Sequence, residues 1–243
     1  MVESSSHKLA SHSFLELGGV VVPDDPRVIT PAIRAAIVSG RFETEEARQI
    51  PRIVEPGDRV LEIGAGLGYI STLLSRERRV ASVLAVEANP GLMDYMSDLH
   101  ACNRVRKVRR LNTVLTNEDC SRKTFFRRAD FWMGSLLPGP NPYLDSVDVP
   151  TTRLNDLLRE EGIDLIVCDV EGAEVGLFED ADLSGVDRVF LEVHDHVTGL
   201  AGVGRLFATL AGQGLVYDPR HSEGSVVLFR RVGPDDVLRP YEG

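Results

Sequence analysis

The pattern of apolar positions changes near Pro56. Before it, apolar residues recur at helical spacing from Ile29 to Ile37, and Gly40 is expected to end that helix. Thr44 is expected to cap a second helix, because a threonine oxygen at this position accepts a hydrogen bond from a free N–H of the first turn. We interpret residues 1–56 as an N-terminal helical extension with a polar, serine-rich and partly disordered start.

From residue 57 onward, short apolar segments alternate with amphipathic helical ones. Strands that are apolar along their whole length and separated by helices form a parallel sheet that is covered on both faces. The pattern therefore predicts an α/β fold with a mostly parallel sheet and a C-terminal antiparallel hairpin. The expected strands are residues 59–63, 80–87, 108–115, 165–169 and 189–194, and the hairpin comprises residues 215–217 and 225–229.

One long segment, residues 120–152, interrupts this alternation. It carries three phenylalanines, the single tryptophan Trp132 and a Pro- and Gly-rich run that ends at Tyr143. Connections of this length inside a compact domain are usually functional. We predict an inserted hairpin or lid between the third and fourth parallel strands, within a domain that spans residues 57–243.

The composition narrows the possible functions. The chain has 243 residues, 27 Lys and Arg against 37 Asp and Glu, and a formal net charge of −10, which disfavours a general nucleic-acid binder. The basic runs at residues 104–110 and 122–128 are interpreted as solvated faces. Three cysteines without a CxxC pair suit neither a disulfide framework nor a zinc site. Because no apolar segment has the length of a signal peptide or a membrane span, we expect a soluble, cytoplasmic protein.

A glycine-rich turn follows the first predicted strand. Gly64, Gly66 and Gly68 allow the backbone to turn sharply and to approach a ligand without an intervening Cβ, and the next helix presents free N–H groups to that ligand. The spacing is GxGxG, whereas the dinucleotide fingerprint is GxGxxG, and Tyr69 stands where its third glycine would fall. An acid, Glu62, precedes the turn. This combination favours a site for S-adenosylmethionine (SAM), which has no pyrophosphate.

A second acid lies at the end of the second predicted strand. Glu87 follows Gly68 by 19 residues. In an open parallel sheet, ligands bind outside the carboxyl ends of the strands, and a carboxylate there can accept hydrogen bonds from the ribose hydroxyls of a nucleoside. The glycine turn and Glu87 are therefore predicted to bind the same cofactor.

Acids and histidines follow the fourth and fifth predicted strands, which end at the same edge of the sheet. Asp169 and Glu171 follow one strand, and Glu192 and His194 close the other. Two interpretations compete. Either His194 or Asp169 is a general base that takes the proton of a substrate hydroxyl, or Asp169 with Glu192 or His194 holds a divalent metal ion that polarises it. Oxygen ligands favour Mg²⁺, and a histidine shifts the preference toward a transition metal. The candidate catalytic residues are Asp169, Glu171 and His194.

Several runs of the sequence resemble the FkbM family of SAM-dependent methyltransferases. They are SGRFE at 39–43, PGD at 56–58, VLEIGAGLGYIS at 60–71, VEANP at 86–90 and, most specifically, DLIVCDVEGAE at 164–174. The resemblance implies a class I methyltransferase (Rossmann-like) fold with a mostly parallel seven-stranded sheet and helices on both faces. It also implies O-methylation of a hydroxyl on a small molecule or sugar, with SAM as cofactor.

The resemblance also implies roles for individual residues. Asp169 and Glu171 would face the methyl group, and residues 112–115 would border the adenine. The chain departs from the family pattern at Glu62, where many members have Asp, and at Gly66-Leu67, where many have Asn-Ile. The implied cofactor-binding residues are Glu62, Gly64, Gly66, Gly68, Tyr69, Glu87, Ala88, Asn89, Asn112, Thr113, Val114 and Asp169.

Two alternative functions come from other classes. An RNA or protein methyltransferase is the first, but an adenine amino-methylase would carry (D/N)PPY after the fourth strand, where this chain has DVEG. A non-catalytic SAM-binding protein is the second, and it would not need titratable groups beside the methyl group. For the favoured function, Phe42, Trp132 and Tyr143 are the candidate wall of the acceptor site.

Overall fold

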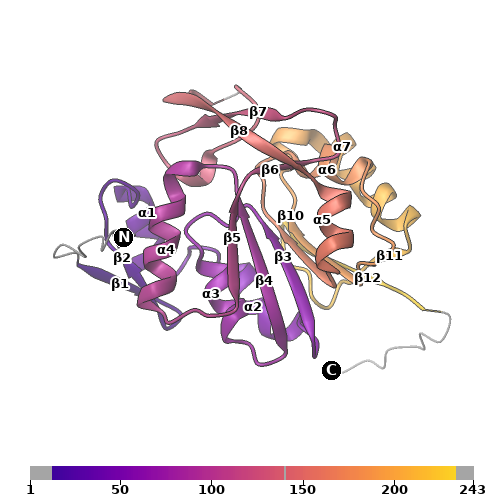
Figure 1. Ribbon diagram of the computed structural model, residues 1–243, viewed down its shortest axis with the longest axis horizontal. Helices are drawn as coiled ribbons and strands as arrows, with labels where there is room; N and C mark the ends of the chain where they lie inside the picture. Colours follow the sequence, from indigo (N-terminus) through magenta and orange to yellow (C-terminus); the bar gives the residue numbers. More distant parts are fainter. Residues whose placement is uncertain (1–12, 140, 234–243) are drawn as a thin grey trace, which may run out of the picture.

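A seven-stranded sheet forms the centre of the computed structural model, which describes residues 13–139 and 141–233 (Figure 1). The strands lie in the order β11–β12–β10–β9–β3–β4–β5. The expected mostly parallel sheet is confirmed, because the strands from β10 to β5 pair in parallel and β12 pairs antiparallel with both β10 and β11. The strands are β3 (Asp58–Ile63), β4 (Val80–Glu87), β5 (Val108–Asn112), β9 (Leu165–Cys168), β10 (Arg188–Glu192), β11 (Leu215–Tyr217) and β12 (Val226–Arg231).

Helices cover both faces of this sheet, as its apolar strands predict (Figure 1). Side chains alternate between the two faces along each strand, so that Val60 of β3 packs in one core cluster and its neighbour Leu61 in the other. The first cluster includes side chains of α1 (Pro31–Val38), α2 (Thr44–Ile53), α3 (Tyr69–Arg76) and α4 (Met93–Cys102). The second includes side chains of α5 (Leu154–Glu161), α6 (Glu174–Glu179) and α7 (Asp195–Gly212).

The N-terminal segment contains more than the expected helices. Strands β1 (Phe14–Leu17) and β2 (Val20–Pro23) form an antiparallel hairpin before α1. The prediction that Thr44 caps α2 is wrong: its hydroxyl donates to the carbonyl of Gly40 at 2.6 Å, and the N-cap residue is Glu43 in a left-handed conformation. The expected disordered start falls on residues 1–12, which lie outside the described residues.

The predicted strand 108–115 is in fact two strands in different sheets. Strand β5 ends at Asn112, whose side-chain amide donates to the carbonyl of Glu87 at 2.8 Å. The hydroxyl of Thr113 then donates to Pro150 at 2.7 Å, so that the chain leaves the large sheet at this point. The strands β6 (Val114–Thr116), β8 (Asp145–Arg153) and β7 (Arg122–Arg127) make a separate three-stranded sheet.

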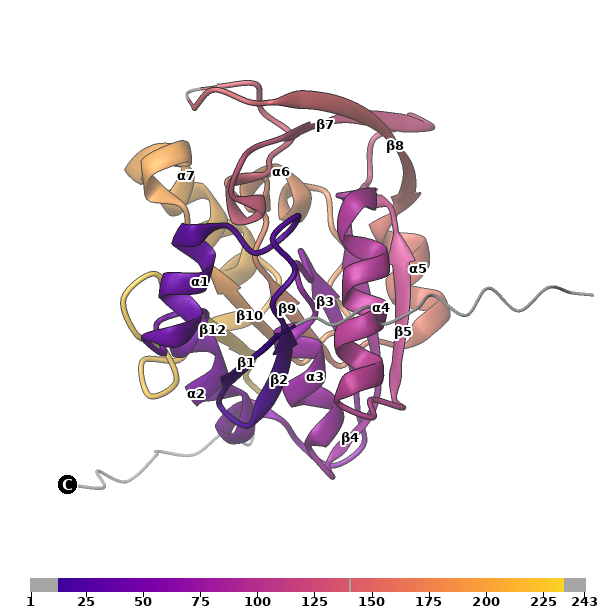
Figure 2. The same cartoon turned by 90° about the vertical axis from the view of Figure 1, so that its left-hand side faces the viewer.

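The insertion forms the predicted hairpin. Strands β7 and β8 pair antiparallel over six residue pairs, and the short 3₁₀ helix η2 (Phe131–Met133) lies in the connection between them. In both views this hairpin spans one end of the molecule, above the large sheet (Figures 1 and 2). Among the described residues, no helix combines the length and apolar character that crossing a bilayer requires.

A buried ion pair joins the amino-terminal ends of β3 and β10, at the edge of the sheet that lies away from the hairpin. The guanidinium of Arg188 donates to Asp58 at 2.7 Å and 3.2 Å, and to the backbone carbonyl of Ile53 at 2.8 Å. The two charged side chains are only 3% and 2% exposed. Removing one partner of such a pair leaves the other charge buried and uncompensated.

We predict that Asp58→Asn lowers the free energy of unfolding by about 3 kcal/mol. The matched control is Arg109→Ala, which breaks an ion pair between exposed side chains and should cost less than about 1 kcal/mol. Urea denaturation followed by circular dichroism measures both. Equal losses in the two variants would contradict the structural role assigned to the buried pair.

Candidate active site

A cavity of about 500 Å³ lies at the carboxyl ends of the parallel strands, beneath the β7–β8 hairpin. Its floor comes from the turns after β3, β4 and β9, and its roof comes from the insertion. This edge of a parallel sheet is where ligands bind in open α/β folds. The residues that line it and that the sequence predicted as site residues are Gly64, Gly66, Glu87, Ala88, Thr113, Val114, Asp169 and Glu171.

The backbone of the glycine turn packs so closely on neighbouring parts of the site that its glycines cannot be replaced by residues with a side chain. A Cβ on Gly64 would stand 1.7 Å from the backbone oxygen of Asp169, and one on Gly66 would stand 3.2 Å from the ring of Phe131. Both residues have positive φ values, of 86° and 51°. Glycine is required at Gly64 because any other residue would displace the Asp169 backbone.

The carboxylate of Glu87 joins the glycine turn to the loop after β4. One oxygen accepts a hydrogen bond from the Gly66 N–H at 2.8 Å and the other accepts from the Asn89 N–H at 2.6 Å. Burial raises the pKa of Glu87 to about 7, although these backbone hydrogen bonds favour the charged form. Glu87 thus faces the cavity in the place that the sequence predicted.

A smaller cavity adjoins the first and is surrounded by acids. Glu62 is buried there, and its Oε2 atom has no hydrogen-bond partner. Burial raises the pKa of Glu62 to about 8, against the effect of hydrogen bonds from Ser71. The neighbouring acids that also line this cavity are Glu43, Glu46, Asp169 and Glu192. Burial raises the pKa of Glu43 as well, and the charge of Glu46 adds to the shift. This concentration of carboxylates favours a cationic ligand.

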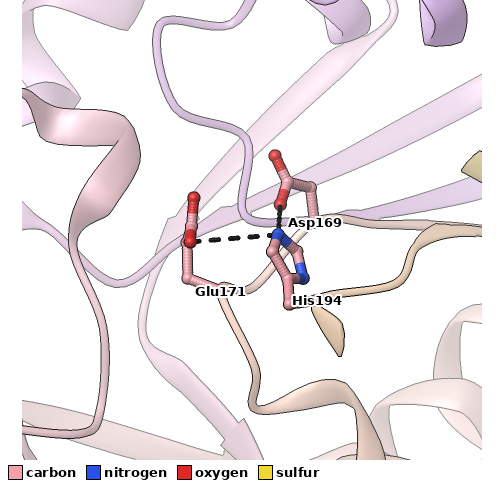
Figure 3. A group of neighbouring side chains, drawn as sticks. All are labelled: Asp169, Glu171 and His194. Atoms are coloured by element: carbon pink, nitrogen blue, oxygen red, sulfur yellow. Dashed lines mark ion pairs between the residues drawn. The ribbon is translucent and has the colours of Figure 1, made fainter. Parts of the chain in front are cut away.

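Three predicted catalytic residues meet at the ends of β9 and β10 (Figure 3). The Nε2 atom of His194 lies 3.3 Å from Oδ1 of Asp169 and 3.9 Å from Oε2 of Glu171. On its other side, Nδ1 of His194 lies 3.4 Å from Oε1 of the buried Glu174. The imidazole is therefore held between three carboxylates, two of which line the large cavity.

The charges of this group shift one another's pKa. Burial lowers the pKa of His194, but the carboxylates of Asp169 and Glu174 more than compensate and raise it to about 11. Burial and the charge of Asp169 raise the pKa of Glu171 to about 7. At neutral pH His194 is accordingly an imidazolium that cannot accept a proton, whereas Glu171 titrates near pH 7.

The aromatic roof only partly matches the predicted wall. Trp132 lines the cavity. Phe42 does not line the cavity, but its ring stacks on the ring of Trp132, with centroids 6.1 Å apart. Tyr143 lies outside the cavity, half exposed, against Phe126. The sequence analysis missed the remaining roof residues, Phe125, Phe126, Phe131, Ser135, Leu136 and Leu137, although the cluster of aromatic residues in the insertion pointed to them.

Four predicted cofactor residues line neither cavity: Gly68, Tyr69, Asn89 and Asn112. Tyr69 is buried in the core, edge-on to Phe42 at 6.0 Å. Asn89 caps η1 (Pro90–Leu92) by accepting from the Gly91 N–H. Glu43 lines both cavities and was not predicted. The SGRFE run that ends at Glu43 was the available signal.

The basic runs are largely engaged within the protein. Lys107 donates to backbone carbonyls, and Arg128 is buried with its guanidinium on four backbone carbonyls. Arg127 pairs with Asp145. Arg128 therefore departs from the interpretation of the runs as solvated faces, because its side chain is buried.

Comparisons with known proteins identify the family of the chain. The family model described as "Methyltransferase FkbM domain" matches residues 62–214, which include the glycine turn, the acidic loop and the insertion. A search of curated proteins finds no match.

Several solved structures are similar to this chain. Trm5b from Pyrococcus abyssi is 13% identical with a TM-score of 0.50, and the match covers 90% of this chain but only 55% of Trm5b. TYW2 from M. jannaschii, solved in complex with AdoMet, is 15% identical with a TM-score of 0.47 and coverages of 91% and 87%. Precorrin-6y C5,15-methyltransferase from Geobacter metallireducens is 11% identical with a TM-score of 0.48 and coverages of 78% and 88%. At such identities the likeness concerns the fold alone.

The family match extends over more than half of the sequence and contains both the glycine turn and the acidic loop that build the site. The chain belongs to the FkbM family of SAM-dependent methyltransferases.

Proposed function

We propose that this methyltransferase transfers the methyl group of SAM to a hydroxyl oxygen of a small molecule or sugar. The observation that carries the proposal is the cavity beneath the hairpin, which has an aromatic roof and acidic groups on its floor. A pocket of this size and apolar character suits a small ligand. The acids supply what a hydroxyl acceptor needs, because the oxygen must lose its proton as it attacks.

The residues of the site fit SAM. Gly64 and Gly66 line the cavity without a side chain, so that a ligand can approach their backbone, and Glu87 lines the same cavity and is proposed to bind the ribose hydroxyls. The orphaned Oε2 atom of Glu62 and the acids around it suit the ammonium group of the methionine part. When bound, SAM supplies an electrophilic methyl group on a positively charged sulfur.

On the acceptor side, we assign different roles to the three residues in Figure 3. Glu171 lines the cavity and titrates near neutrality, so it is the proposed proton acceptor for the hydroxyl. His194 stays protonated between Asp169 and Glu174 and holds Asp169 in place. Positioning of the acceptor oxygen in line with the methyl–sulfur bond would supply much of the rate.

A small acceptor is favoured over RNA or protein for two reasons. The β7–β8 hairpin lies above the large sheet (Figure 2), and Trp132 and phenylalanines of the insertion line the cavity, which suits a small acceptor with apolar parts. Several basic residues of the two runs are engaged by carboxylates and carbonyls of the chain itself, as Arg127 and Lys107 illustrate.

We predict that Glu62→Gln stabilises the protein increasingly as the pH rises. The pKa of Glu62 in the folded chain, about 8, lies above its usual value of 4.5. Folding is therefore most favourable when this group is protonated and loses roughly 1.4 kcal/mol per pH unit between the two pKa values. A glutamine has no such penalty, so unfolding free energies of the two proteins should diverge from pH 5 toward pH 8 by about that slope.

The same variant should bind SAM roughly tenfold or more weakly, because a charge-assisted contact to the ammonium is lost. Urea denaturation across the pH range and calorimetric titration of SAM measure the two effects. Parallel stability curves would refute the buried, titrating state of Glu62, and unchanged SAM affinity would remove Glu62 from the cofactor site.

The acceptor class is tested with methyl-labelled SAM. We expect label to enter hydroxyl-bearing small molecules or sugars from a metabolite extract, and to be absent from RNA and protein fractions. With the acceptor so identified, Glu171→Gln should reduce turnover by roughly 10²- to 10⁴-fold. The wild-type rate should fall as the pH drops below 7, because Glu171 becomes protonated there.

Glu179→Gln is the matched control, since Glu179 is an exposed residue of α6 that pairs with Arg205. It should leave turnover within a factor of about two. Label found in RNA or protein would contradict the small-molecule proposal, and full activity of Glu171→Gln would exclude Glu171 as the base.

A further inference from the structure

The group formed by Asp169, Glu171 and His194 has the arrangement of a metal site. One ligand atom from each residue lies within 4.8 Å of the other two. The set combines two carboxylate oxygens with one imidazole nitrogen, and it comes from two adjacent parallel strands, β9 and β10, whose pairing fixes the distance between them. In the close-up, one oxygen of Asp169 and one oxygen of Glu171 both lie beside Nε2 of His194 (Figure 3).

The histidine is oriented as a ligand would be. His194 is 4% exposed, and its Nδ1 atom lies 3.4 Å from Oε1 of Glu174, an oxygen that accepts a hydrogen bond from the His194 backbone N–H at 3.0 Å. Its Nε2 side is thereby aimed at Asp169 and Glu171. Histidines that bind metals generally have their other ring nitrogen held by a carboxylate or carbonyl in this way.

A second observation concerns the hydrogen bonding of Asp169. Its Oδ1 atom is buried and makes no hydrogen bond, although it lies 3.3 Å from Nε2 of His194. Buried carboxylate oxygens normally accept hydrogen bonds, so this oxygen is available to bind an ion. The rest of the Asp169 side chain is 41% exposed and reaches the cavity, which leaves coordination positions open toward an acceptor.

The chemical types of the three ligands also indicate which metal ion the site prefers. Mg²⁺ is usually bound by oxygen ligands alone, whereas imidazole favours first-row transition metals. Two carboxylates and one imidazole, without a thiolate, suit Mn²⁺ or a similar ion better than Mg²⁺.

We propose that Asp169, Glu171 and His194 bind one divalent transition-metal ion of the Mn²⁺ type, with Glu174 as the positioning residue for His194. The ion takes the place of the proton that Nε2 of His194 carries in the metal-free protein, and this proton is released to solvent on binding. Glu171 offers Oε2 to the ion and keeps its second oxygen for the proton of the acceptor. An acceptor hydroxyl in an open coordination position would be held beside the methyl group and made more acidic. That last role rests on the proposed function, whereas the binding of the ion does not.

The test is electron paramagnetic resonance of Mn²⁺ titrated into the purified chain after treatment with a chelator, without SAM or acceptor. We expect one bound Mn²⁺ per chain and weaker binding of Mg²⁺ in competition. Asp169→Asn and His194→Gln should each weaken Mn²⁺ binding at least tenfold. Glu174→Gln should weaken it by roughly 10- to 100-fold, as loss of a supporting carboxylate does.

His196→Gln is the matched control, because His196 is exposed and its ring lies 5.8 Å from that of His194 without belonging to the ligand set. It should bind Mn²⁺ like the wild type, and circular dichroism verifies the fold of every variant. No Mn²⁺ binding to the folded wild type, or equal binding in wild type, Asp169→Asn and His194→Gln, would overturn the proposal. Methylation that persists in the fully chelated enzyme would remove the catalytic role only, and metal binding without hydroxyl methylation would overturn the proposed function alone.

Discussion

The site depends on one close contact between two backbones. The N–H of Asp169 donates to the carbonyl of Ile63 at 2.9 Å, and a Cβ on the next residue, Gly64, would overlap the Asp169 carbonyl oxygen. The turn after β3 and the loop after β9 can approach this closely only because glycine stands at the crossing. That approach places the glycine turn beside Asp169 and Glu171, so that the cofactor side and the acidic side share one cavity.

The second feature is an excess of negative charge along this edge. Burial raises the pKa values of Glu62, Glu87 and Glu171 well above those of free carboxyls, which means that ionising them costs folding free energy. Such a cost at one edge of an otherwise well-packed sheet is typical of a binding site, where stability is sacrificed for function. A sulfonium, an ammonium or a metal cation would each relieve it. The same physical property thus links the proposed SAM site to the proposed metal site.

The sequence predicted those features of the fold that depend on residues close together in the chain. The apolar strands, the glycine turn and Glu87 were all predicted at their observed places, because each depends on its own residue types and spacing. The break between β5 and β6 could not be predicted from local patterns, because it depends on a hydrogen bond from the Thr113 hydroxyl to the carbonyl of Pro150, a residue far along the chain. Tyr69 was expected at the cofactor for its position after the turn, yet packing against Phe42 keeps it in the core. The protonated state of His194 likewise arises from Asp169 and Glu174, which belong to a segment that follows a different strand.

The central claim is that the glycine turn and Glu87 together form the SAM site. Calorimetric titration of SAM and S-adenosylhomocysteine into wild type, Glu87→Gln and the exposed control Glu16→Gln tests it most directly. We predict micromolar binding of both ligands to wild type and control, and binding weaker by roughly tenfold or more in Glu87→Gln, because the variant lacks the charged acceptor for the ribose hydroxyls. Absence of binding to the folded wild type, or identical affinities in wild type and Glu87→Gln, would contradict this account.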